Sequence, residues 1–266
     1  MSSLLSNFSF NILRAGFAEV GPDWSKNLLA APHNRLYLIT GGEADMTCTD
    51  NRIITMLPDH IYLFPVFSLK SSFCRKSLSH YYLNFHADSV YMEELLSLCP
   101  EQLPINREIS PEIITLFNEV TENHKLQGIS AEMKKSGALL RLLSFFFKDF
   151  ENKNAEITGF SAVINYIERN LKKEMTVQNL AALMGLSVNY FSDRFNALFG
   201  NPPRQYIIKK RLELACMLLF KTDKKIREIA AETGFPDESY FTRIFRKKNK
   251  MSPMEYRNRR EDETEI

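Results

Sequence analysis

Two stretches of the sequence carry polar side chains that could hydrogen-bond to the edges of nucleotide bases. In each stretch these side chains recur at spacings of three and four residues and point away from an apolar stripe, so they share the outer face of a predicted helix. Asparagine can pair with adenine, arginine with guanine, and a carboxylate can accept from the cytosine amino group. The candidate base-reading residues are Asn189, Ser192, Asp193 and Asn196 in the first stretch, and Glu238, Ser239, Thr242 and Arg243 in the second.

Lysines and arginines close to these stretches could neutralise phosphates. Phosphate contacts position a protein on the duplex, whereas base contacts specify the sequence. The alternative is that these charges form an ordinary solvated face. Asp193 and Glu238 would each bring a negative charge near phosphates, so for them the alternative is a cap or an ion pair with Arg194 or Arg243. The candidate phosphate contacts are Lys209, Lys210, Arg211, Arg246, Lys247 and Lys248.

The helices that must position these residues are predicted by a pattern that occurs twice. Up to and including the glycine the two copies are offset by 49 residues, as from Gly185 to Gly234, and after it by 50, as from Phe191 to Phe241. The second copy therefore has one more residue in its turn. The offset of 50 continues in Phe195 and Phe245, Pro203 and Pro253, and Tyr206 and Tyr256.

Each copy has the signals of a helix, a tight turn and a second helix. Thr176, Ser187 and Asp237 are suited to cap helix N-termini. The glycine can adopt the left-handed backbone that ends the first helix, and phenylalanines four residues apart form the inward face of the second. This is the helix-turn-helix pattern. A single copy could occur in any helical bundle, but two copies in register favour DNA binding.

The charge is distributed unevenly along the chain. Residues 161–260 contain 20 Lys and Arg against 10 Asp and Glu, a balance of +10. Residues 1–160 contain 14 against 18, or −4, and the last six residues add −4, which gives the net charge of +2. The modest overall charge thus hides a basic C-terminal part, as expected of a nucleic-acid-binding domain.

The segment from about Phe160 to Arg260 resembles the DNA-binding domain of the AraC/XylS family of bacterial transcription regulators. The most characteristic stretches run from Ile226 to Phe235, from Tyr240 to Lys247 and from Ser252 to Arg257. The resemblance implies that the candidate base-reading residues, Asn196 apart, occupy positions that contact DNA in relatives. The continuous helix expected over residues 204–220 would be a spacer of roughly 25 Å, so the two reading helices could enter successive major grooves.

The N-terminal part is predicted to be rich in β-strands. Short apolar runs at residues 35–40, 52–57, 61–65 and 80–86 are separated by turn-forming residues. The arrangement resembles the cupin-like sensor barrel of many AraC-type regulators. The sequence thus predicts an α+β chain of two domains. Residues 1–152 would form a cupin-like ligand-sensing and dimerisation domain with helices, and residues 153–266 an all-α DNA-binding domain with two helix-turn-helix units.

One face of the strand at residues 80–86 is polar and aromatic, and could line a site for a small-molecule effector such as a sugar. The alternatives are a solvent face for this strand and core positions for the other aromatic residues. The histidines lack the tight spacing of a metal site, so we expect no metal, no cofactor and no catalytic residue. The candidate ligand-binding residues are Trp24, Tyr37, His80, Tyr82, Asn84 and His86.

A predicted helix over residues 130–150 is apolar most of the way round, which fits either burial within one chain or packing against a second subunit. A polar linker at residues 151–156 is expected to precede a helix starting near Ser161. The four cysteines are far apart, so buried free thiols are expected. No apolar run is long enough to span a membrane, and we expect a soluble cytoplasmic protein.

Together these features predict a sequence-specific transcription regulator that responds to a small molecule. The expected partners are double-stranded DNA, an effector and a second copy of the chain, with RNA polymerase as a further candidate and no membrane. One alternative is a cupin-type metal-dependent enzyme with a DNA-binding appendage. Another is a regulator without a ligand.

Overall fold

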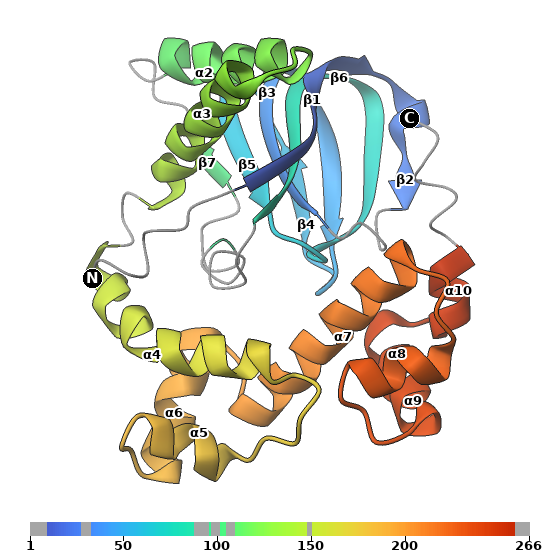
Figure 1. Cartoon of the computed structure of the whole chain (residues 1–266). Helices are drawn as coiled ribbons and strands as arrows, with labels where there is room; N and C mark the ends of the chain where they lie inside the picture. Colours follow the sequence, from blue (N-terminus) through green and yellow to red (C-terminus); the bar gives the residue numbers. More distant parts are fainter. Residues whose placement is uncertain are drawn as a thin grey trace. The chain divides into compact units, whose positions relative to one another are not determined.

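The computed structural model describes residues 10–27, 33–87, 96, 102–104, 110–147 and 151–258 (Figure 1). Contacts between Cα atoms divide the chain into two compact units, Met1–Asn152 and Lys153–Ile266. The first unit contains an antiparallel sheet and two helices, and the second contains only helices. No helix in the described part of the chain combines the length and the apolar character needed to cross a membrane.

The strands of the first unit form one antiparallel sheet. Its strand order is β1-β6-β3-β5-β7, with β2 paired to β6 and β4 paired to β3. Within the described residues β1 and β7 are not hydrogen-bonded to each other, so the sheet is open and the predicted cupin-like barrel is not confirmed. The strands are β1 Phe10–Val20, β2 Lys26–Asn27, β3 Asn34–Cys48, β4 Ile53–Met56, β5 His60–Phe64, β6 Leu69–Ala87 and β7 Gln102–Pro104, and a short 3-10 helix η1 spans Pro22–Trp24.

The two faces of the sheet have different surroundings. On one face Tyr81 of β6 lies beside Phe17 of β1 and Phe117 of α2, with ring centroids 4.9 Å and 5.8 Å apart. Helices α2 (Ser110–His124) and α3 (Ile129–Phe147) lie over this side of the unit (Figure 1). The opposite face carries a core of aromatic and sulfur-containing side chains that includes Tyr37, Met46 and Met56.

The predicted long helix after Gly128 is α3, and it is buried along one side only. Leu139, Leu142 and Leu143 are buried, whereas Ile129 and Met133 are 81% and 72% exposed. The following segment differs from the sequence prediction, because α4 begins at Glu151 and continues to Arg169. The predicted linker at residues 151–156 is therefore helical. The segment contains neither proline nor glycine, so nothing in it interrupts a helix that is extended from Ser161 toward the N-terminus.

The second unit repeats one helical arrangement around a central helix, α7 (Figure 1). The starts of α5 and α8 are 49 residues apart, whereas those of α6 and α9, and of α7 and α10, are 50 apart. Four residues separate α5 from α6 and five separate α8 from α9, which confirms the longer second turn. The helices are α5 Val177–Leu183, α6 Val188–Phe199, α7 Pro203–Lys221, α8 Ile226–Glu232, α9 Glu238–Asn249 and α10 Pro253–Asn258.

Candidate nucleic-acid interface

The second helix of the first copy, α6, is fixed by its cap and by its apolar face. The Ser187 hydroxyl accepts a hydrogen bond from the Tyr190 amide at 3.4 Å, as predicted for a cap. Phe191, Phe195 and Phe199 are buried and pack around Phe160 of α4, each with its ring centroid 5.8 to 5.9 Å from that ring. The inward phenylalanines thereby hold the opposite face of α6 toward solvent.

The predicted base-reading residues of α6 lie on that outer face. Asn189, Asp193 and Asn196 are exposed, whereas Ser192 is half-buried. The Ser192 hydroxyl donates to the Val188 carbonyl at 2.7 Å, so only its lone pairs remain for another partner. The outer face of α6 therefore offers two amides, one carboxylate and one hydroxyl acceptor.

The corresponding helix of the second copy, α9, is built in the same way. A carboxylate oxygen of Asp237 accepts from the Tyr240 amide at 2.7 Å, which confirms the predicted cap. Phe241 and Phe245 are fully buried, and Phe245 meets Tyr256 of α10 edge to face at 5.4 Å. The helix ends in the left-handed conformation at Lys250, as α6 does at Gly200.

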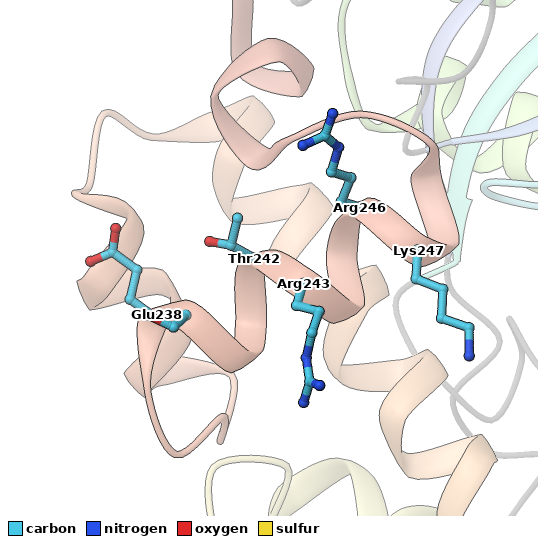
Figure 2. Close-up of a pocket in the computed structure, with 6 residues that line it drawn as sticks. Glu238, Thr242, Arg243, Arg246 and Lys247 are labelled. Atoms are coloured by element: carbon cyan, nitrogen blue, oxygen red, sulfur yellow. The ribbon is translucent and has the colours of Figure 1, made fainter.

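The exposed side of α9 forms a shallow hollow of about 680 Å³. Its lining brings together all four base-reading candidates of the second copy and two of the phosphate candidates: Glu238, Ser239, Thr242, Arg243, Arg246 and Lys247. In Figure 2 Glu238 lies near the start of the helix, and Arg243, Arg246 and Lys247 lie further along it. A cation-rich surface next to hydrogen-bonding groups suits the edges and phosphates of a duplex.

The orientation of Arg243 depends on a neighbour that the sequence interpretation did not single out. Its guanidinium lies over the Tyr240 ring, 5.3 Å from the centroid, a cation–π contact. Within the described residues Arg243 makes no ion pair with Glu238, so the alternative of pairing between them is not supported. The spacing of three residues in a helix is the signal that could have identified Tyr240.

Two of the predicted phosphate contacts do not fit their positions. Lys210 is only 6% exposed; its ammonium lies 3.2 Å from the Glu213 carboxylate and over the Tyr206 ring. Arg211 donates to the carbonyls of Leu171 and Lys173 at 2.9 Å and 2.8 Å. Both side chains therefore stabilise the domain. Burial lowers the pKa of Arg211 below its usual value.

The remaining phosphate candidates lie at the surface. Arg246, Lys247 and Lys248 are exposed in the last turn of α9. The Lys209 ammonium lies 3.8 Å from Glu213, and its side chain is about one-third exposed. The run on α9 is thus the most accessible group of predicted phosphate contacts.

Arg211 also explains a close approach at Gly234. The glycine has a φ of +81°, and a Cβ placed there would lie 2.2 Å from the Leu171 carbonyl oxygen and 3.0 Å from the Arg211 guanidinium. Gly185, the equivalent residue of the first copy, has a φ of +64° and open space around it. The turn of the second copy is therefore packed against the α4–α5 connection through Arg211.

Three of the predicted ligand-binding residues meet on the sheet of the first unit. The His80 ring lies 5.4 Å from Trp24 and 5.5 Å from Tyr37, while Tyr82, Asn84 and His86 continue along β6 as half-buried residues. His80 is 2% exposed, so it does not occupy a solvent face. Burial lowers the pKa of His80 to about 4, which keeps the ring neutral near pH 7.

Nothing in the described residues suggests a metal centre, because no three His, Cys, Asp or Glu side chains there group as ligands. Cys48, Cys74 and Cys216 are buried free thiols, as predicted, and Cys99 lies outside the described residues. Burial raises the pKa of Cys216 to about 12.

Comparison with known proteins bears on the second unit most directly. A helix-turn-helix domain family matches residues 180–259. The chain is 34% identical over 107 residues to LumQ of Photobacterium leiognathi, described as a probable transcriptional regulator, covering 40% of this chain and 43% of LumQ. It is 28% identical over 153 residues to the transcriptional activator RhaS of Mannheimia succiniciproducens, covering 58% of this chain and 57% of RhaS. The chain thus spans about half the length of these curated relatives.

One similarity to solved structures covers both units. The crystal structure of unsaturated fatty acid bound ToxT from Vibrio cholerae matches with a TM-score of 0.54 and 16% identity. The match covers 94% of this chain and 95% of ToxT. At this identity the similarity concerns the fold, which combines a β-rich N-terminal part with helix-turn-helix units at the C-terminus.

Proposed function

We propose, on the premise that this chain belongs to the AraC/XylS family of transcription regulators, that it controls transcription by binding double-stranded DNA through α6 and α9. The observation that carries this proposal is the doubled helix-turn-helix unit. Both copies hold a short capped helix by inward phenylalanines and present polar side chains on the other face. The relatives reported above are regulators, which supports this function over an enzymatic one.

The helix α7 would set the distance between the two reading helices. It has 19 residues, which corresponds to about 28 Å at 1.5 Å per residue. With the widths of the flanking units, this length is compatible with successive major grooves about 34 Å apart. The proposed base contacts are Asn189, Ser192, Asp193, Asn196, Glu238, Ser239, Thr242 and Arg243, and the proposed phosphate contacts are Lys209, Arg246 and Lys247.

The first unit, residues 1–152, is proposed to bind a small-molecule effector and to form a homodimer. The ToxT crystal structure has an unsaturated fatty acid bound, which supports the general idea of a bound effector. The exposed side chains of Ile129 and Met133 on α3 provide apolar surface suited to a second copy. RNA polymerase is a proposed further partner at the promoter.

The proposal is tested by measuring how the purified chain binds promoter fragments taken from upstream of neighbouring genes. Footprinting locates the site, and titrations across a range of salt concentrations measure counterion release. Affinity should fall steeply with salt, because neutralised phosphates release condensed ions. Arg243→Ala should lose about 1–3 kcal/mol and relax the preference at one base pair, as expected of a base contact.

A matched control is Arg75→Ala, which removes an exposed arginine from the other unit, where it pairs with Asp45 at 3.0 Å. This variant should bind DNA like the parent. Equal losses for Arg243→Ala on all sequences would identify a phosphate contact instead of a base contact. Binding that does not change with salt would contradict the proposed interface.

A further inference from the structure

Three neighbouring strands of the first unit place two arginines and an asparagine in one row. Asn84 of β6 pairs with Arg14 of β1 on one side and with Arg35 of β3 on the other. Directly opposed residues of antiparallel strands point to the same face, with Cβ atoms about 5 Å apart. The row therefore brings two guanidinium groups to the two sides of a single amide.

Among the described residues, no acidic side chain balances this row. In that part of the chain neither guanidinium makes an ion pair or a hydrogen bond, although Arg35 is only 6% exposed. A buried charge is normally paired, because leaving water without a partner is costly. Asn84 adds a carbonyl oxygen, Oδ1, that is buried and has no hydrogen-bond partner within the described residues.

His33 lies near the same row and reports its electrostatic character. Its Nε2 atom is buried, and the described residues offer it no hydrogen-bond partner. Burial lowers the pKa of His33 to about 2, and Arg35, His86 and Arg14 lower it further. Every charged neighbour that acts on this imidazole in the described structure is basic, so the site has an excess of positive charge.

The next row on the same face is aromatic. Gly16, Tyr82 and Tyr37 are cross-strand neighbours there. A Cβ at Gly16 would lie 2.8 Å from the Tyr82 hydroxyl oxygen, so the glycine leaves room for this ring to lie against β1. A cationic row beside an aromatic row matches a molecule with an anionic group at one end and an apolar or ring body at the other.

We propose that Arg14, Asn84 and Arg35 bind the anionic group of a small organic carboxylate or phosphate, whose body lies toward Tyr82. Guanidinium groups form paired, charge-assisted hydrogen bonds with both kinds of anion. The Asn84 amide lies between the two guanidiniums and supplies a further donor to the anion through its nitrogen. This inference rests on the proposed effector-binding function of the first unit, and assigns the chemical class of the effector.

The test is a titration of the full chain with matched charged and neutral probes, followed by the fluorescence of Trp24. This is the single tryptophan of the sequence, and its ring lies 6.5 Å from Tyr37, next to the proposed site. The probes are octanoate against octanol for the carboxylate arm, and glucose 6-phosphate against glucose for the phosphate arm. A saturable change with one charged probe, but not with its neutral counterpart, is the expected result and identifies which anion is bound.

Variants then locate the binding. Arg35→Gln should weaken the binding of the charged probe by about tenfold or more, as expected for losing a hydrogen bond to a charged group. Arg14 is exposed, so Arg14→Gln tests the same row with little risk to folding. Arg75→Gln, on the same strand as Asn84 but far along it, is the matched control and should bind as the parent does.

Two results would overturn the inference: no charged probe binds at millimolar concentration, or Arg14→Gln and Arg75→Gln weaken binding equally. The same preparations are assayed for promoter binding without any probe. Retained DNA binding with no anion binding would reject this inference alone. Anion binding without DNA binding would reject the proposed regulatory function and leave the anion site in place.

Discussion

The two glycines that end α5 and α8 provide an internal comparison of backbone strain and packing. Gly185 and Gly234 occupy equivalent positions and both have positive φ values, +64° and +81°. Only Gly234 lies against another segment, since its missing Cβ faces the Leu171 carbonyl. Gly185→Ala therefore introduces the conformational strain alone, whereas Gly234→Ala introduces the same strain together with a steric clash.

The expected magnitudes follow from these contacts. An L-residue in the left-handed region costs about 1–2 kcal/mol, partly offset by the lower entropy of the unfolded chain, so Gly185→Ala should lose about 1 kcal/mol. In Gly234→Ala the Leu171 carbonyl must move away from the Arg211 guanidinium, whose Nε donates to it at 2.9 Å. A hydrogen bond to a charged group is worth about 1.5–3 kcal/mol, and the total loss should be about 3–4 kcal/mol.

Urea unfolding followed by far-UV circular dichroism measures both losses. The midpoints convert to free energies of unfolding at constant slope. Because both glycines lie in the same unit, any coupling to the other unit affects the two variants alike and cancels in their difference. The reasoning also predicts that Arg211→Met reduces the excess loss of Gly234→Ala, because the hydrogen bond is then already absent.

Equal losses for Gly185→Ala and Gly234→Ala would refute the close approach at Gly234. An unchanged difference between the two in the Arg211→Met background would show that the hydrogen bond to Leu171 is not the cause. A larger loss for Gly185→Ala would contradict the open surroundings of that residue.

Two further predictions follow from buried titratable groups. Lowering the pH from 7 toward 4 should decrease the stability of the first unit, because the unfolded chain binds a proton near pH 6.5 that folded His80, with its pKa of about 4, does not bind. The loss for this residue is at most about 3 kcal/mol. His80→Leu should flatten the dependence of the urea midpoint on pH, and an unchanged slope would contradict the assignment. The Cys216 thiol, with its pKa raised to about 12 by burial, should resist iodoacetamide at pH 8 until the protein unfolds, so rapid native alkylation would argue against its burial.

The helix-turn-helix units were predictable because their signals are local. Caps such as Ser187 and Asp237 act within one turn of the helix, and the glycines that end the first helices act through their own φ angles. The inward spacing of Phe191 and Phe195 follows from the helix period alone. The offset of 49 and then 50 residues located the longer turn without any knowledge of tertiary contacts.

The failures arose where tertiary packing decides the outcome. Lys210 and Arg211 have the composition of a phosphate-binding run, yet α7 turns them toward Glu213 and the Leu171 carbonyl. Whether a set of strands closes into a barrel depends on pairing between its end strands, which a pattern of apolar runs does not specify. The row of Arg14, Asn84 and Arg35 likewise depends on strand register, so sequence alone singled out only Asn84.

The uninterrupted helix α7 has a consequence for the DNA sites that this protein could use. A rigid spacer fixes both the separation and the relative rotation of α6 and α9, so neither can follow a displaced half-site. Adding one base pair between the half-sites would rotate one of them by about 34° around the duplex and move it away from its helix. Operators of this protein should therefore share one fixed spacing, while the bases within the two half-sites vary.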